Sequence, residues 1–358
     1  MTEIEQRRQT AAARLADLKI DALLVSSPAS VRYLTDYSGS NGLVLLSRGE
    51  SHFFTDPRYG LEASQKITCR VHVAKKPLID AVIAVLKRKK LKKTGFESAW
   101  MRFEDYSKLK QGLPSGFSLH PIGSVLEEQR MIKSAAEIER IRNSVNTNSR
   151  AFSAVLRQIK PGAREQEIAA ALDFEMRRLG AEKPSFETIV AAGDRSALPH
   201  AHPSARPLGG NELLLIDMGA TLDGYSSDMT RVAFTGAPPK RIRDLYRAVL
   251  EAQLAAMDSV RAGAVAGGVD AAARKVLKRH GLDREFIHST GHGLGLEIHE
   301  PPRIGKRSKT KLQAGMAITI EPGAYVAGLG GVRIEDTILV TQNGCEVLTP
   351  TPKELVQI

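Results

Sequence analysis

The feature of this sequence that most limits its possible folds is a set of four carboxylates within apolar, strand-like segments. Asp217 interrupts the run Leu-Leu-Leu-Ile-Asp217-Met, and Asp228 follows it after an Asp-Gly turn. Glu321 ends the run Ala-Ile-Thr-Ile-Glu321, and Glu335 lies in the returning segment Val-Arg-Ile-Glu335. If each pair of segments forms a hairpin, Asp217 and Asp228 lie nearly opposite each other. Like charges buried so close together are destabilising, and the pattern therefore predicts a bound cation or a shared proton.

A glycine-rich segment between the two expected hairpins adds an imidazole to these carboxylates. It reads His288-Ser-Thr-Gly-His292-Gly-Leu-Gly, and His299 follows shortly after it. A lone histidine or aspartate is more often a core, surface or capping residue, but four carboxylates and His292 together are costly to bury without metal. Two divalent cations would neutralise the four negative charges, and an oxygen-rich set suits manganese, cobalt or iron, with zinc possible. Strand alternation places Arg333 on the same face as Glu335, where we expect it to support the ligands.

The chain of 358 residues has room for two domains of roughly 100–200 residues each. The elements expected in the first third are a helix over 4–18 and strands over 21–25, 42–46 and 51–55. A polar stretch containing Gly and Pro then precedes a long helical pattern from 135 to 159. We therefore expect one domain over residues 1–125 and a second over 126–358.

The second domain contains a weak internal repeat with an offset of 101 residues. Ile159-Lys-Pro-Gly-Ala aligns with Val260-Arg-Ala-Gly-Ala, and an amphipathic helical pattern follows each. Similarity between alanine-rich helices alone could arise by chance. Because each copy is followed by strands with a pair of carboxylates, the pattern favours a duplication.

Composition favours a globular protein of the reducing cytoplasm. Lys and Arg exceed Asp and Glu by 51 to 40, but the densest basic run, 87–93, follows an apolar helical pattern and has no aromatic residues for base stacking. This favours a solvated helix end over a nucleic-acid surface. Cys69 and Cys345 are too few for a disulfide framework, and neither a signal-like N-terminus nor an apolar run of about 20 residues is present. We expect no nucleic-acid or membrane partner.

The carboxylate and histidine segments resemble those of the pita-bread metallopeptidases, which include aminopeptidase P, prolidase and methionine aminopeptidase. The matching segments are Ile216-Asp217-Met-Gly, Ser227-Asp228-Met-Thr-Arg231, Thr290-Gly-His292-Gly, Ile320-Glu321-Pro-Gly and Val332-Arg-Ile-Glu335-Asp. The resemblance implies an α+β fold with a pita-bread catalytic domain, preceded by a smaller α/β domain of the creatinase/prolidase type. Methionine aminopeptidases generally lack such an N-terminal domain. The resemblance also implies a homodimer.

The resemblance further implies roles for individual residues. Five residues match the ligands of a dinuclear centre, with manganese favoured: Asp217, Asp228, His292, Glu321 and Glu335. Glu321 is also the candidate general base. His200 matches a histidine that contacts the scissile carbonyl or its oxyanion, His288 one that lines the substrate pocket, and His299 one that binds substrate and shuttles protons.

The sequence also allows a purely structural role for two further positions, Phe186 and Arg303. Phe186 matches an aromatic wall of the proline pocket, and an ordinary core phenylalanine is equally compatible with the sequence. Arg303, in His299-Glu-Pro-Pro-Arg303, matches an arginine that holds a dipeptide's carboxylate in several prolidases. Its alternative is a surface charge in a basic stretch.

The function implied is a metal-dependent exopeptidase that uses a metal-bridged hydroxide to cleave between an N-terminal residue and a penultimate proline. Proline lacks an N–H and has a fixed φ, so this bond needs a dedicated pocket. Segments of the first domain, Gly-Ser-Asn-Gly42 and Thr-Asp-Pro-Arg58-Tyr, favour an Xaa-Pro aminopeptidase, whereas the Arg303 segment favours the alternative, an Xaa-Pro dipeptidase. Two less favoured alternatives are a creatinase-type C–N hydrolase, which would work after chelation, and a non-enzymatic binding protein, which would have lost ligands.

Overall fold

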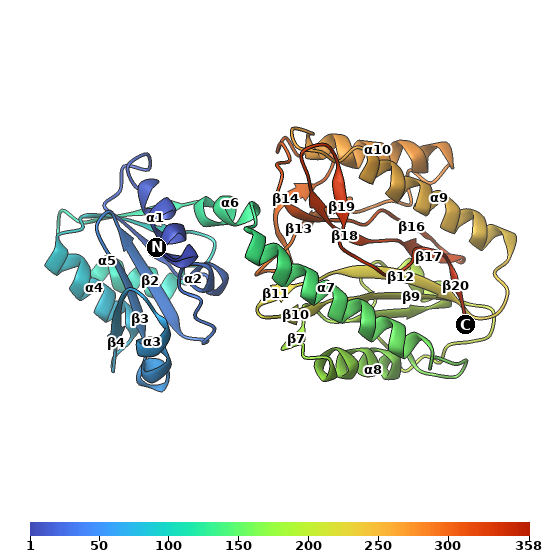
Figure 1. Cartoon of the computed structure of the whole chain (residues 1–358), viewed down its shortest axis with the longest axis horizontal. Helices are drawn as coiled ribbons and strands as arrows, with labels where there is room; N and C mark the ends of the chain where they lie inside the picture. The colour runs from blue at the N-terminus through green and yellow to red at the C-terminus, as the bar shows by residue number, and fades with distance from the viewer. The chain divides into compact units, whose positions relative to one another are not determined.

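The computed structural model describes residues 1–358 and divides the chain into two compact units, Met1–Arg130 and Met131–Ile358. Each unit has its own sheets and its own buried apolar clusters (Figure 1). None of the helices combines the length and the apolar character that a bilayer crossing needs.

The first unit is built on a mixed six-stranded sheet. Its strands are β1 (Ala22–Val25), β2 (Gly42–Ser47), β3 (Ser51–Thr55), β4 (Arg70–Val73), β5 (Lys93–Glu97) and β6 (Ser118–Ile122), in the order β4-β3-β2-β1-β5-β6. Its helices are α1 (Glu3–Ala13), α2 (Pro28–Thr35), α3 (Gly60–Lys66), α4 (Leu78–Lys89), α5 (Phe103–Gly112) and, at the end of the unit, α6 (Val125–Met131). The three predicted strands are confirmed as β1, β2 and β3. The helix predicted over 4–18 is too long, because α1 gives way to turns that end at Lys19 with φ of 55°.

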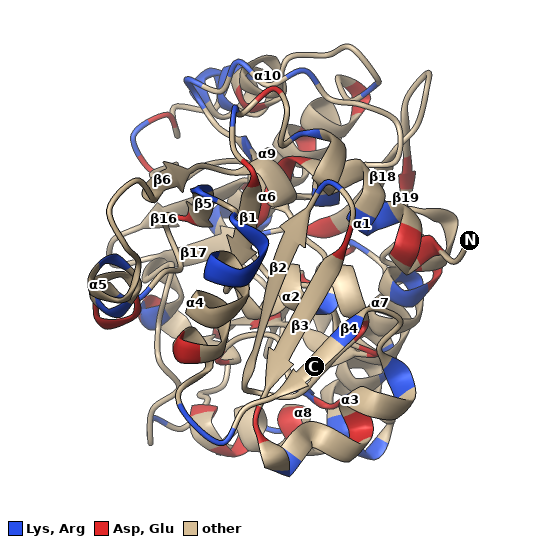
Figure 2. Cartoon of the chain, turned by 90° about the vertical axis from the view of Figure 1, so that its left-hand side faces the viewer, with Lys and Arg blue, Asp and Glu red and all other residues tan.

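The basic run lies at the end of α4, as the sequence predicts. Lys87, Arg88 and Lys89 occupy the last turn, and Lys90 ends the helix in the left-handed conformation. Figure 2 shows this blue helix end at the surface, whereas the residues of α4 facing the sheet are apolar. The lysines therefore stand where the negative end of the helix dipole favours cations.

The second unit contains four long helices and four small sheets. The helices are α7 (Ala135–Leu156), α8 (Glu165–Arg178), α9 (Lys240–Asp258) and α10 (Ala266–Arg279). The strands of its first half are β7 (Lys183–Pro184), β8 (Ile189–Ala192), β9 (Leu213–Met218), β10 (Ala220–Leu222), β11 (Tyr225–Ser226) and β12 (Met229–Phe234). The later strands are β13 (Gly291–Gly293), β14 (Glu300–Ile304), β15 (Ala317–Ile320), β16 (Gly323–Val326), β17 (Gly330–Arg333), β18 (Asp336–Val340), β19 (Cys345–Val347) and β20 (Val356–Gln357).

The order of these elements confirms the predicted repeat and the pita-bread fold. The pair α7–α8 precedes the hairpin β9/β12, and the pair α9–α10 precedes the hairpin β15/β18. In Figure 1 the strands of this unit lie between the two helix pairs. Two apolar clusters correspond to these layers, one joining α7 and α8 to β8, β9 and β12, the other joining α9 and α10 to the strands.

Strand β9 shows how the layers position a functional residue. Its even-numbered residues Leu214 and Ile216 pack in the α7–α8 cluster, whereas Leu213 and Leu215 pack in the α9–α10 cluster. Because side chains alternate along a strand, Asp217 projects to the same side as Leu215. The carboxylate thus enters the interior between the two halves of the repeat.

Candidate metal centre

The later hairpin is interrupted at its two glutamates. Strand β15 pairs with β18, and β16 pairs with β17, so the two ladders are separated by Glu321-Pro322 on one side and Ile334-Glu335 on the other. The returning segment therefore passes from one sheet to another at this point, and the expected hairpin is built from two ladders instead of one. The interruption brings Glu321 and Glu335 close to each other.

The earlier hairpin brings its two aspartates together with an offset. Asp217 of β9 is paired with Thr230 of β12, so Asp228 lies two positions before the partner of Asp217. The two aspartates are thus diagonal neighbours rather than directly opposite residues. Diagonal neighbours on one face of a sheet remain within reach of each other's side chains.

The side chains from both hairpins converge with His292 of β13. Ligand atoms of Asp228, His292 and Glu335 all lie within 4.8 Å of one another. His292 Nε2 is 3.5 Å from Asp228 Oδ2 and 3.4 Å from Glu321 Oε1. Asp217 is close enough for its charge to raise the pKa of Asp228. The structure therefore brings all five expected ligands into one cluster.

The electrostatics of this cluster suit a bound cation. Burial, and then the charge of Asp217, raises the pKa of Asp228 well above its usual range, and burial and the charge of Asp228 do the same to Glu335. Asp217 Oδ1 and Glu335 Oε1 are buried and have no hydrogen-bond partner. Crowded carboxylates with unpaired oxygens are what divalent cations bind, so the residues present fit such ions.

Arg333 supports the carboxylates through hydrogen bonds. Its Nη2 donates to Asp217 Oδ2 at 2.6 Å, and its Nε donates to Thr230 Oγ1 at 3.0 Å. The Thr230 hydroxyl in turn donates to Glu335 Oε2 at 2.7 Å. Arg333 therefore occupies the supporting position expected from the sequence.

Both ring nitrogens of His288 have hydrogen-bond partners. Nδ1 lies 2.8 Å from the Ser289 carbonyl, and Nε2 lies 2.8 Å from the Tyr325 hydroxyl, to which Arg333 Nη1 also donates at 2.7 Å. Burial, and then the charge of Arg333, lowers the pKa of His288 to about 4. A neutral imidazole that donates to the carbonyl and accepts from the tyrosine satisfies both contacts.

The other two catalytic candidates flank the cluster. His299 packs edge-on against His292, with ring centroids 4.4 Å apart, and burial followed by the charge of His292 lowers the pKa of His299. His200 is exposed near the start of the loop that joins Ala197 to β9, and the neighbouring Pro199 carbonyl accepts from Arg333 Nη1 at 3.3 Å. The structure thus brings both histidines to the edge of the site.

The last two expected site residues, Phe186 and Arg303, come from different segments of the second unit. Phe186 is half-buried, and its ring lies so close to Gly219 that a Cβ there would be 2.8 Å from Phe186 Cε1. Arg303 of β14 is paired with His292, is exposed, and donates through Nε to Ser289 Oγ at 3.3 Å. Arg303 and His288 line one cavity of about 560 Å³, together with Arg274, Lys306 and Arg307.

Sequence reasoning missed Tyr325 and Thr230, which join Arg333 to His288 and to Glu335. Thr230 could have been found from the sequence, because the register of the β9/β12 hairpin places it opposite Asp217. Tyr325 is two positions from the partner of Arg333 in the β16/β17 ladder, and thus on the same face.

The fold and the site define a two-domain hydrolase of the pita-bread class. Residues 139–342 match the model of metallopeptidase family M24, and residues 7–132 match the creatinase/prolidase N-terminal domain. The chain belongs to metallopeptidase family M24.

Relatives match the chain along nearly its whole length. An Xaa-Pro dipeptidase of Pyrococcus furiosus is 38% identical over 340 residues, covering 94% of this chain and 95% of its own. The structure of an Xaa-Pro dipeptidase from Bacillus anthracis superposes with a TM-score of 0.96 at 37% identity, covering 99% of this chain and 100% of that one. The structure of an X-Pro aminopeptidase from Thermotoga maritima gives a TM-score of 0.90 at 34% identity, with 96% and 100% covered.

Proposed function

We propose that the protein is a metal-dependent Xaa-Pro dipeptidase, a prolidase that hydrolyses dipeptides with proline in the second position. The observation that carries this proposal is the location of Arg303, which is paired with His292 and shares a cavity with His288. The aminopeptidase preference drawn from the sequence is not confirmed, and the dipeptidase alternative fits the relatives better.

Arg303 suits the recognition of a dipeptide because both of its Nη atoms lack a partner in the protein. Only its Nε has a protein partner, so both Nη atoms are available to a ligand. A dipeptide carries its C-terminal carboxylate directly on the proline, and a guanidinium binds a carboxylate through two parallel hydrogen bonds. A longer peptide lacks a carboxylate at this distance from the scissile bond.

The ligand set and its chemistry follow from the cluster described above. Asp217, Asp228, His292, Glu321 and Glu335 would hold two divalent ions, with manganese favoured, and such ions polarise a carbonyl and acidify a bound water. Glu321, whose Oε1 accepts from Thr319 Oγ1 at 3.1 Å, would take the proton of the attacking water.

The remaining residues would bind and orient the substrate. His200 would donate to the oxyanion that forms from the scissile carbonyl, and His299 would contact the substrate and pass a proton to the leaving group. His288 would form a neutral wall of the pocket, and Phe186 would offer a flat apolar surface to the proline ring. The homodimer implied by the resemblance remains a prediction, which light scattering tests.

The variant Arg303→Ala tests the dipeptidase proposal. We expect KM for Ala-Pro to rise about 10- to 100-fold with a smaller change in kcat, because a charge-assisted contact to the ground state is lost. Lys306→Ala is the matched control, since Lys306 lines the same cavity and has no part in the proposal. An unchanged KM for Ala-Pro in Arg303→Ala would contradict the proposal.

A further inference from the structure

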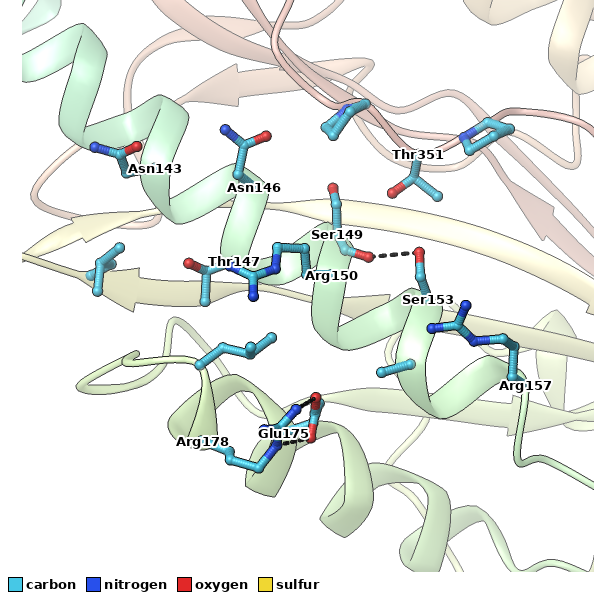
Figure 3. A pocket seen from close by; sticks show the side chains of 15 residues that line it. Asn143, Asn146, Thr147, Ser149, Arg150, Ser153, Arg157, Glu175, Arg178 and Thr351 are labelled. Atoms are coloured by element: carbon cyan, nitrogen blue, oxygen red, sulfur yellow. Dashed lines mark hydrogen bonds and ion pairs between the residues drawn. The ribbon is translucent and has the colours of Figure 1, made fainter.

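We propose that a groove along the outer face of α7 is a second binding site, which takes an elongated oxyanion such as a polyphosphate chain. The groove has a volume of about 860 Å³ and runs between α7, α8 and the segment 350–352 (Figure 3). None of the candidate metal ligands lines it. The inference is independent of the proposed peptidase activity.

The groove has a net positive charge, because three arginines and one glutamate line it. Arg150 of α7 and Arg157, which caps the end of α7, are exposed, and neither makes an ion pair or a side-chain hydrogen bond, although the charge of Arg150 helps Arg178 to lower the pKa of Glu175. Arg178 on α8 is tied to Glu175 through contacts of 2.6 and 2.7 Å, which Figure 3 marks with dashed lines. Glu175 is the only acidic residue lining the groove, and two guanidinium groups therefore remain available to an anion.

Two buried hydroxyls in the groove lack partners. Ser149 is only 5% exposed and Thr351 only 8%, and neither side-chain oxygen has a hydrogen bond. In Figure 3 both side chains point into the gap between α7 and the segment 350–352. Buried hydroxyls are nearly always hydrogen-bonded in native proteins, so a ligand with acceptor oxygens would complete this pair. The neighbouring Ser153 does not need one, because it donates to the Ser149 carbonyl at 2.9 Å.

The spacing of the arginines indicates the shape of the ligand. Arg150 and Arg157 are two turns apart on one helix, or about 10 Å at a rise of 1.5 Å per residue. A chain of phosphates or an extended polycarboxylate spans this distance and can contact both guanidinium groups and the hydroxyls at once. Asn143 and Asn146 add exposed amide donors along the same face of α7.

Calorimetric titration of the full-length, metal-loaded protein tests this proposal with sodium tripolyphosphate as the probe. We expect the double variant R150Q/R157Q to lose at least about 10-fold in affinity, because two charge-assisted contacts are removed. R241Q, which removes an exposed arginine of α9 outside the groove, should bind like the unchanged protein. Any binding of the probe to the metal ions is common to all three proteins, so only the difference between them reports on the groove.

Further arms identify the ligand chemistry and the hydroxyl contact. Orthophosphate should bind more weakly than tripolyphosphate, and citrate in place of tripolyphosphate distinguishes a carboxylate from a phosphate ligand. Thr351→Val should weaken binding of the preferred probe several-fold without lowering the melting temperature, because the removed hydroxyl has no partner in the protein. Equal binding by the unchanged protein and R150Q/R157Q, or no binding of either anion at millimolar concentration, would overturn the proposal.

Discussion

Arg333 donates to Asp217 at 2.6 Å through Nη2 and reaches Glu335 through the hydroxyl of Thr230. One guanidinium thus connects a carboxylate of the first half of the repeat to a carboxylate of the second half. Arg333 is itself buried, so its own positive charge depends on these partners. The positions of the carboxylates in the cluster therefore depend on both halves of the repeat.

The first prediction concerns Arg333→Lys. A lysine keeps the charge but loses the fork that contacts Asp217 and Thr230 together, so we expect affinity for manganese to fall about 10- to 100-fold. Calorimetric metal titration measures this. Tyr325→Phe is the control, because it leaves the contact between Arg333 and Asp217 in place and should bind manganese like the unchanged protein. Unaltered metal affinity in Arg333→Lys would show that the arginine has no supporting role.

The second prediction concerns the crowding of the carboxylates. Asp228→Asn or Glu335→Gln removes one buried like charge. After chelation we therefore expect the free energy of unfolding to stay the same or to rise by about 1 kcal/mol. The same variants should lose activity in the presence of manganese. Thermal unfolding with and without chelator, together with an assay, tests both parts. Wild-type turnover in both variants would refute the ligand assignment.

A third prediction concerns acid stability of the first unit. His52 Nδ1 of β3 lies 2.9 Å from His72 Nε2 of β4, and burial followed by the neighbouring His52 lowers the pKa of His72 to about 4. The ordinary histidine pKa is about 6.5, so between pH 6.5 and pH 4 the unfolded chain binds more protons than the native state. The contribution of this neutral histidine to the free energy of unfolding is therefore fully present above pH 6.5 and is lost as the pH falls towards 4.

The variant His72→Gln should therefore lose less stability between about pH 7 and pH 5 than the unchanged protein. Urea unfolding at the two pH values measures the difference. His202→Gln, which replaces an exposed histidine of the second unit, serves as the control. An equal loss of stability in His72→Gln and in the unchanged protein would exclude the histidine pair as the cause.

A fourth prediction concerns the segment that carries His288. Arg274 of α10 donates to the Phe286 carbonyl at 2.9 Å and to the His288 carbonyl at 2.5 Å, and Asp270 accepts from its Nε at 2.7 Å. Arg274→Gln should raise KM for Ala-Pro more than it lowers kcat, because His288 loses its fixed position. Lys275→Gln, an exposed neighbour, is the control. A change in kcat alone would contradict a positioning role.

The candidate ligands could be found from the sequence because charge inside an apolar run is an exceptional local signal. Asp217 and Glu321 stand out in this way without any knowledge of tertiary structure. Thr230 and Tyr325 do not, since their importance arises only from strand register and from the contact each makes with Arg333. The interruption at Glu335 has no local signal either, because it arises where the chain passes from one sheet to another.

The fold was predictable where local and tertiary signals agree. Ser134 and Glu137 form a capping box that begins α7 at its predicted start, whereas no residue near Ala13 signals the early end of α1. The roles of Arg303 and Phe186 could be inferred only from resemblance. Whether such residues face a substrate depends on packing between segments far apart in the chain.

The most direct test of the metal-dependent dipeptidase activity is the hydrolysis of Ala-Pro and of Ala-Pro-Ala by the purified protein, each with manganese and after chelation. We predict that Ala-Pro is cleaved, that chelation abolishes this cleavage, and that manganese restores it, with little or no cleavage of Ala-Pro-Ala. Cleavage of Ala-Pro-Ala in preference to Ala-Pro would contradict the dipeptidase proposal and favour an aminopeptidase. Cleavage of Ala-Pro that persists after complete removal of metal would contradict the metal centre itself.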